Sequence, residues 1–128
     1  MGRSLVVGKP VSVLLLDRHA TVTTCHSRTG DLPAIVRKGD VVILATGRAK
    51  AYGRDFFHPG QTVLDVGINV DEAGNLCGDA DFDAIEPIVD AITPVPARHW
   101  RCDHEHAHET CGGSGRKNLL NLLNARSV

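Results

Sequence analysis

A continuous apolar run at residues 41–45, Val-Val-Ile-Leu-Ala, restricts the fold of this chain more than any other feature of its sequence. Short runs rich in β-branched residues are typical of parallel strands that are buried on both faces of a sheet. We therefore predict a strand over residues 40–47. Residues 62–68 form a second apolar strand pattern, and residues 20–26 are rich in the β-branched residues that strands favour.

Helix-length segments separate these expected strands. Pro10 stands at the first turn of an apolar stretch, where its absent N–H costs nothing, so we predict a helix over residues 9–17. Further helices are predicted over residues 32–37, which Gly39 closes, and over residues 81–91. Strands that alternate with helices form a parallel sheet with right-handed crossovers. The predicted fold is α/β, a Rossmann-like doubly wound parallel sheet.

The two ends of the chain depart from a complete fold of this kind. A doubly wound fold needs a first strand that leads into its first glycine turn. Gly2 directly follows Met1, so we expect the sheet to be truncated at its first strand. The alternation of strand and helix patterns stops after Pro96. The sequence thus predicts a partial Rossmann-like domain over residues 1–96 and an atypical C-terminal tail over residues 97–128.

The bulk composition argues against several classes of protein. The chain has 128 residues, enough for one domain, and a formal net charge of −1, which gives no support for a nucleic-acid or polybasic membrane surface. Apolar runs such as residues 11–16 are far shorter than the roughly 20 residues that span a bilayer. No secretory signal pattern is found. The four cysteines form no tight framework, which favours a reduced, cytoplasmic location.

The first residues of the chain have the features of a variant dinucleotide-binding turn. Gly2, Arg3 and Ser4 are followed by Val7 and Gly8, where the first predicted helix opens. Small residues let backbone N–H groups approach a pyrophosphate, and the helix N-terminus adds partial positive charge. The spacing differs from the common G-x-G-x-x-G pattern, so an ordinary strand-to-helix turn is the alternative.

Ser27 and Arg28 stand where a Rossmann domain distinguishes NAD from NADP. NAD sites place Asp or Glu there, to accept a hydrogen bond from the ribose 2′-hydroxyl. A carboxylate would repel the 2′-phosphate of NADP, whereas Ser27 and Arg28 can donate to it, and Arg3 is expected near the same strand end. We therefore predict NADP as the cofactor, with a solvated polar turn as the alternative.

Taken together, these segments resemble the C-terminal half of bifunctional methylenetetrahydrofolate dehydrogenase/methenyltetrahydrofolate cyclohydrolase. The resemblance covers residues 2–96. It rests on motifs in matching order and spacing: residues 2–10 (Gly-Arg-Ser-Leu-Val-Val-Gly-Lys-Pro), 25–29 (Cys-His-Ser-Arg-Thr), 65–69 (Asp-Val-Gly-Ile-Asn), 78–82 (Gly-Asp-Ala-Asp-Phe) and 92–96 (Ile-Thr-Pro-Val-Pro).

The resemblance implies an activity and roles for single residues. The activity is NADP-dependent oxidation of 5,10-methylenetetrahydrofolate to the methenyl form, followed by hydrolysis to 10-formyltetrahydrofolate, a part of one-carbon metabolism and purine biosynthesis. By the same resemblance, Arg3 and Ser27 would hold the 2′-phosphate. Ser4 would face the ribose or pyrophosphate, and Ile68 would lie beside the nicotinamide. A homodimer is implied for full-length members.

The resemblance also implies what this chain lacks. The family's catalytic Lys and Tyr, and its folate-binding Asp, lie in an N-terminal domain that we expect to be absent, so the folate substrate would bind through that missing domain. We therefore expect no catalytic residue within this chain and no turnover by the chain alone. The alternative is a non-catalytic nucleotide-binding or interaction module with the same fold.

The tail lends itself to two interpretations. Cys102 with His104, and His108 with Cys111, supply ligand types suited to zinc, but their spacing matches no zinc finger. The codons that residues 98–117 permit, read one base later, can encode the glycine turn and final helix of the family. We therefore expect a frameshift product that contributes no metal site and no folded structure, because it has little apolar periodicity.

Overall fold

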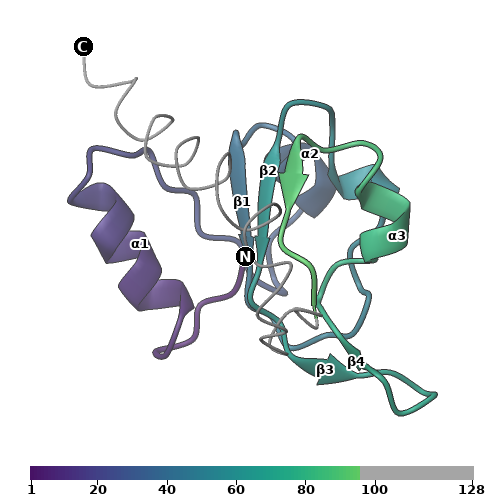
Figure 1. Ribbon diagram of the computed structural model, residues 1–128. Coiled ribbons are helices and arrows are strands. Elements are labelled where there is room, and N and C mark those ends of the chain that lie inside the picture. The colour runs from purple at the N-terminus through teal and green to yellow at the C-terminus, as the bar shows by residue number, and fades with distance from the viewer. Residues whose placement is uncertain (96–128) are drawn as a thin grey trace, which may run out of the picture.

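The computed structural model of the chain describes residues 1–95 (Figure 1). These residues form an α/β fold with a parallel sheet, as the sequence predicts. Figure 1 shows α1 on the β1 side of the molecule, with α3 on the other side, beyond β2 and β5. The predicted tail, residues 97–128, lies outside the described residues, as do its zinc and frameshift interpretations. No helix among residues 1–95 is both long enough and apolar enough to cross a membrane.

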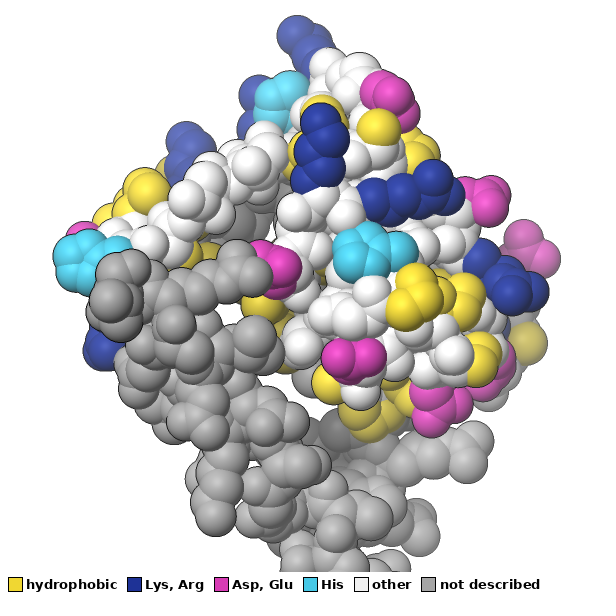
Figure 2. Space-filling model, turned by 90° about the horizontal axis from the view of Figure 1, so that it is seen from above, with side chains coloured by type: hydrophobic (Ala, Val, Ile, Leu, Met, Phe, Trp, Pro, Cys, Tyr) yellow, Lys and Arg dark blue, Asp and Glu magenta, His cyan; other side chains and the backbone are white. Residues whose placement is uncertain are grey.

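Three parallel strands make up the main sheet, in the order β1-β2-β5. They are β1 (Val41–Leu44), β2 (Thr62–Asp65) and β5 (Ala91–Ile92). All three run toward the end of the sheet at which the N-terminus lies (Figure 1). Figure 2 shows the opposite, amino-terminal end of the strands, where Lys and Arg side chains are scattered among side chains of other types.

Both apolar strands are shorter than the sequence predicts, and side-chain hydrogen bonds account for the difference. Beyond Leu44 the N–H groups of residues 46–48 turn to the carboxylate of Asp79 instead of a neighbouring strand. Beyond Asp65 the Gly67 N–H donates to the side chain of Asp65 itself, at 2.8 Å. Each strand therefore ends where the following backbone N–H groups donate to a carboxylate instead of to a neighbouring strand.

The predicted strand over residues 20–26 is wrong, because this segment is an irregular chain in the structure. A strand is defined by a ladder of backbone hydrogen bonds to a neighbour. Among residues 1–95, the backbone contact of this segment to another extended segment is a single bond, from the Gly2 N–H to the Cys25 carbonyl, at 2.9 Å. The composition favours a strand, but among the described residues no strand lies alongside to complete the ladder.

Two of the three predicted helices lie close to their expected positions. They are α1 (Gly8–Leu16) and α2 (Leu32–Val36). Asp31 is the N-cap of α2, and its side chain accepts a hydrogen bond from the Ala34 N–H. The third, α3, covers only Phe82–Ile85, so the predicted helix over residues 81–91 is too long. Pro87 explains the early end, because it has no N–H to donate to the preceding turn.

A short hairpin follows β2 and was not expected from the sequence. It pairs β3 (Asn69–Val70) with β4 (Leu76–Cys77) in antiparallel register. Its turn is closed by Asp71, whose Oδ1 accepts hydrogen bonds from the N–H groups of Ala73 and Asn75 at 3.0 and 2.8 Å. Each strand has only two residues, too few for the alternation by which strands are recognised.

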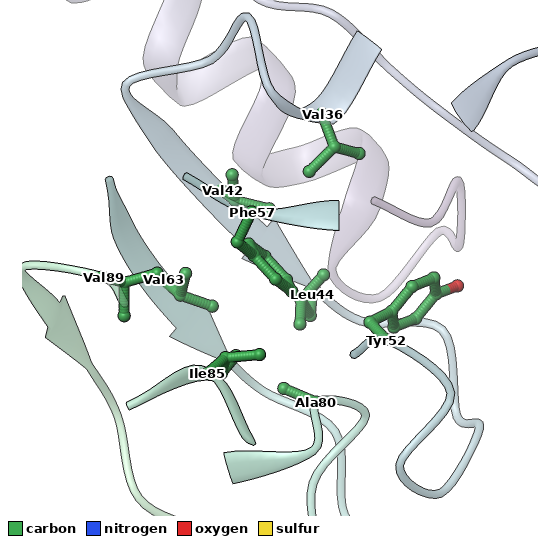
Figure 3. Close-up of a cluster of buried hydrophobic side chains, with 9 residues drawn as sticks. All are labelled: Val36, Val42, Leu44, Tyr52, Phe57, Val63, Ala80, Ile85 and Val89. Atoms are coloured by element: carbon green, nitrogen blue, oxygen red, sulfur yellow. The ribbon is translucent and has the colours of Figure 1, made fainter. Parts of the chain in front are cut away.

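The buried core connects the sheet with α2, α3 and the loops around the 3₁₀ helix η1 (Arg54–Phe56). Gln61 is fully buried at its edge, where its amide donates to the carbonyls of Val36 and Gly39 and accepts from the His58 N–H. Helix α1 has no buried residue and is outside this core. The core side chains, drawn in Figure 3, are Val36, Val42, Leu44, Tyr52, Phe57, Val63, Ala80, Ile85 and Val89.

Candidate functional site

The candidate site lies at the carboxyl ends of the parallel strands, where open α/β sheets bind their ligands. The first two residues of the chain meet this edge. The Ala45 N–H, directly after β1, donates to the Met1 carbonyl at 3.1 Å, and the Gly2 N–H donates to the Cys25 carbonyl at 2.9 Å. Residues 1–2 thus lie between the end of β1 and the segment that ends at Cys25, and Arg3 directly follows them.

The turn from Gly2 into α1 is held by Ser4. Its Oγ accepts hydrogen bonds from the Val7 and Gly8 N–H groups at 3.1 and 3.3 Å, and its carbonyl accepts from the Lys9 N–H at 2.9 Å. The N–H groups that the sequence analysis assigns to a pyrophosphate are therefore bonded to Ser4 in this structure. A phosphate group at this turn would lie at the partial positive charge of the α1 N-terminus, and Ser4 is the residue that holds the turn in shape.

Gly8 is required by the tightness of this turn. A side-chain Cβ at Gly8 would lie 2.3 Å from the Gly2 carbonyl oxygen, closer than real Cβ atoms approach any atom. The two glycines of the predicted dinucleotide turn are thus brought into direct backbone contact. The absence of a side chain also leaves the turn open to a ligand.

Ser27 and Arg28 project from a turn that is fixed by its neighbours. The His26 N–H donates to Thr29 Oγ1 at 2.9 Å, and the Thr29 N–H donates to the His26 carbonyl at 2.9 Å. The side chains of Ser27 and Arg28 are exposed, as is that of Arg3. The Gly2–Cys25 hydrogen bond joins the backbone of the segment that carries Arg3 to the backbone of the segment that carries Ser27 and Arg28.

No carboxylate stands among residues 26–30 to oppose these cations. The next acidic residue along the chain, Asp31, accepts the Ala34 N–H at the start of α2, at 3.4 Å. The carboxylate of Asp31 therefore interacts with the N-terminus of α2 rather than with the turn at residues 26–29. The electrostatics of the turn suit an anionic group better than a hydroxyl group that needs an acceptor.

Ile68, expected from the resemblance to lie beside the nicotinamide, is 79% exposed between β2 and β3. An apolar side chain presented to solvent at the carboxyl end of a strand is suited to cover one face of a flat ring. The neighbouring Gly67 makes room for a protein group: a Cβ there would lie 2.3 Å from Asp79 Oδ1. The structure therefore leaves Ile68, and not Gly67, facing outward.

Asp79 organises this edge and was not identified by the sequence analysis as a site residue. Its carboxylate is fully buried and accepts from the Thr46 N–H and hydroxyl, the Gly47 and Arg48 N–H groups and the Asn69 amide. Burial raises the pKa of the carboxyl, but these hydrogen bonds, that of the Thr46 N–H foremost, outweigh it and hold the pKa below its ordinary value. The motif at residues 78–82 is the sequence signal that could have identified it.

The described residues, 1–95, contain no cluster of His, Cys, Asp and Glu that could hold a metal ion.

Parallel strands, a glycine turn into a helix and a hydroxyl–cation pair on the next turn define a class, the Rossmann-like dinucleotide-binding domains. A family model described as "Tetrahydrofolate dehydrogenase/cyclohydrolase, NAD(P)-binding domain" matches residues 1–98. The chain belongs to this family.

Sequence and structure comparisons agree on this membership. The bifunctional protein FolD of Carboxydothermus hydrogenoformans is 58% identical over 98 residues, which are 75% of this chain and 34% of that protein. FolD of Clostridioides difficile is 59% identical over 97 residues, covering 76% of this chain and 34% of that protein. The chain thus spans about a third of the length of the curated relatives it matches.

Solved structures of the family superimpose on the same segment. The bifunctional dehydrogenase/cyclohydrolase of Thermoplasma acidophilum matches with a TM-score of 0.71 and 44% identity, over 74% of this chain and 34% of that one. The Trypanosoma brucei enzyme, solved with NADP cofactor and an inhibitor, matches with a TM-score of 0.67 and 38% identity, over 75% of this chain and 35% of that one.

Proposed function

We propose that this chain is the NADP-binding part of a methylenetetrahydrofolate dehydrogenase/cyclohydrolase, with residues 1–96 as its cofactor domain. The complete activity would be oxidation of 5,10-methylenetetrahydrofolate to the methenyl form and hydrolysis to 10-formyltetrahydrofolate. The folate would bind to a part of the enzyme outside this chain. Support comes from the family membership and from relatives whose names carry both activities.

The observation that carries the choice of NADP is the exposed group of Arg3, Ser27 and Arg28 at the carboxyl end of the sheet, with no carboxylate in residues 26–30. A 2′-phosphate brings about two negative charges and strong acceptor oxygens to this position. Guanidinium groups bind such oxygens through short charge-assisted hydrogen bonds. The 2′-hydroxyl of NAD would find donors here but no acceptor carboxylate.

The remaining site residues have supporting roles in the proposal. Gly2, Val7 and Gly8 would form the wall of the turn, Ser4 would face the ribose or the pyrophosphate, and Ile68 would cover the nicotinamide ring. When bound, NADP supplies the hydride acceptor of the dehydrogenase step. The residues of this chain bind and orient it, and those that transfer protons to and from the folate lie elsewhere in the complete enzyme.

Two further assignments belong to the proposal. Cys25 and Cys77 are buried free thiols, which supports a reducing, cytoplasmic setting. A homodimer is proposed for the complete enzyme, by the family resemblance.

The test compares NADP and NAD binding by the wild-type chain and by Arg3→Ala and Arg28→Ala. A charge-assisted hydrogen bond contributes about 1.5–3 kcal/mol, so Arg3→Ala should weaken NADP roughly tenfold or more and leave NAD nearly unchanged. Arg37→Ala is the matched control, because Arg37 is an exposed arginine at the end of α2, before β1 begins and so at the opposite end of the sheet. Equal losses of NADP and NAD affinity in Arg3→Ala would contradict the proposal.

A further inference from the structure

The exposed residues Ser27 and Arg28 form the centre of a four-residue turn that their two neighbours close. The Thr29 N–H donates to the His26 carbonyl at 2.9 Å, which is the backbone bond of a β-turn. The bond in the other direction uses a side chain, because the His26 N–H donates to Thr29 Oγ1 at 2.9 Å. His26 and Thr29 are therefore joined twice, and the two residues between them are held on a closed loop of backbone.

The ring of His26 adds a third bond within the turn. The Arg28 N–H donates to His26 Nδ1 at 3.2 Å, and Thr29 Oγ1 lies 3.4 Å from the same nitrogen. A ring nitrogen accepts a hydrogen bond only when it carries no proton. The geometry therefore requires the neutral ring with its proton on Nε2. The Thr29 hydroxyl, whose oxygen accepts from the His26 N–H, can turn its own proton toward Nδ1.

Burial divides the residues of this turn into two pairs. His26 and Thr29 are half-buried, whereas Ser27 and Arg28 are exposed. Hydrogen bonds that are shielded from water are stronger, because water competes less for their donors and acceptors. The residues that fix the turn are thus the better protected ones, and the residues that are available to a ligand lie between them in the chain.

A fixed backbone matters here because the proposed ligand group is a single phosphate. Ser27 and Arg28 have to reach the same 2′-phosphate, and charge-assisted hydrogen bonds to phosphate oxygens are short and directional. Long-range attraction between charges needs no such precision, but physiological salt screens it beyond roughly 8 Å. The NAD ribose carries no phosphate, so a change in the turn should weaken NADP binding and leave NAD binding nearly unchanged.

We propose that His26 and Thr29 are positioning residues that set the preference for NADP over NAD, because their hydrogen bonds hold Ser27 and Arg28 where both can bind the 2′-phosphate. Their role rests on the proposed function, in which Ser27 and Arg28 bind that group. His26 acts as the neutral ring, with the proton on Nε2 and with Nδ1 as the acceptor of the Arg28 N–H. Two uncharged side chains thus decide how well a neighbouring arginine distinguishes the cofactors.

The first experiment measures NADP and NAD affinity for the full chain carrying substitutions of Thr29. Thr29→Val removes the hydroxyl and keeps the branched shape, whereas Thr29→Ser keeps the hydroxyl. We expect Thr29→Val to lower the ratio of NADP affinity to NAD affinity about fivefold or more, the loss of one hydrogen bond. Thr29→Ser should stay within about twofold of the wild-type ratio. So should the matched control Thr21→Val, which changes an exposed threonine in the segment before the turn.

A second pair of variants tests the ring of His26. His26→Asn replaces Nδ1 by a side-chain carbonyl, and an asparagine at this position accepts the N–H two residues further on in an Asx-turn. His26→Leu has no acceptor. We expect His26→Asn to keep the wild-type preference for NADP and His26→Leu to lose it about fivefold or more. Nitrogen-15 NMR of the wild-type imidazole at about pH 8, where an ordinary imidazole is neutral, should show the proton on Nε2.

The outcomes separate this role from the proposed function. Equal affinity of the wild-type chain for NADP and NAD would overturn both. A wild-type preference for NADP that Thr29→Val and His26→Leu leave intact would overturn the positioning role alone. Equal losses of NADP and NAD affinity in these two variants, or an imidazole proton on Nδ1 instead of Nε2, would overturn it as well.

Discussion

Replacing Asp79 should destabilise the fold more than any substitution on the surface of the described residues. Asp79→Ala removes the acceptor for the N–H groups of residues 46–48, for the Thr46 hydroxyl and for the Asn69 amide. A hydrogen bond to a charged group contributes about 1.5–3 kcal/mol, and such values are not additive. Because water can reach part of the loop, we take the equivalent of about two of these bonds, a loss of roughly 3–6 kcal/mol. This is a large fraction of the roughly 5–15 kcal/mol that stabilises a typical domain.

Asp79→Asn tests the charge of the side chain separately from its volume, because it removes the charge and keeps the size. The amide keeps the size of the carboxyl but presents an NH₂ group to backbone donors, so it should cost nearly as much as Asp79→Ala. Urea unfolding followed by circular dichroism measures both. Glu86→Gln, an exposed carboxylate at the end of α3, is the control and should change the free energy of unfolding by less than about 0.5 kcal/mol. Wild-type stability in Asp79→Asn would refute the account of this network.

The same carboxylate predicts a pH dependence. The folded pKa of Asp79 lies below its unfolded value, so its contribution is fully present above the unfolded pKa and is lost as the pH falls through the folded pKa. Wild-type stability should therefore fall below about pH 4, near the unfolded pKa of an aspartate, and Asp79→Asn should flatten this part of the curve. Parallel curves for the two proteins would show that another group titrates.

Three further outcomes follow from contacts in the structure. Gly8→Ala places a Cβ 2.3 Å from a carbonyl oxygen, so it should lower both the melting temperature and the NADP affinity. In the control Gly30→Ala the new Cβ meets nothing within 4 Å, so neither quantity should change. A larger effect of Gly30→Ala than of Gly8→Ala would contradict the turn geometry. Gln61→Ala leaves two carbonyls and an N–H without their partner and should cost about 1–3 kcal/mol in urea unfolding, and a neutral result would mean that water replaces the amide. Lys50→Ala breaks a 3.5 Å ion pair with Asp71. Because the lysine is half exposed and water screens the pair, this substitution should leave the urea unfolding curve nearly unchanged, and a clear loss of stability would reveal a role beyond the pair.

The sequence was sufficient for the parallel sheet because apolar runs such as residues 41–45 report burial on both faces. It was insufficient where tertiary partners decide the outcome. Residues 20–26 have the composition of a strand, but composition cannot supply the neighbouring backbone that makes one. The hairpin of β3 and β4 was missed because two-residue strands carry no periodicity.

The candidate site divides in the same way. The glycines of the first turn and the pair Ser27 and Arg28 are local in sequence, so a role in cofactor binding could be predicted from their neighbours, and that role stays a prediction. Asp79 acts on residues 46–48, more than 30 positions away along the chain. A buried carboxylate that serves distant backbone donors has no local pattern, and only the fold brings the two together.

The most direct test of the central claim is a calorimetric titration of the purified chain with NADP and, separately, with NAD. The account predicts saturable binding of NADP with one site per chain and an affinity for NAD that is lower by roughly tenfold or more. Binding of NAD as tight as that of NADP, or no binding of either by the folded chain, would contradict it.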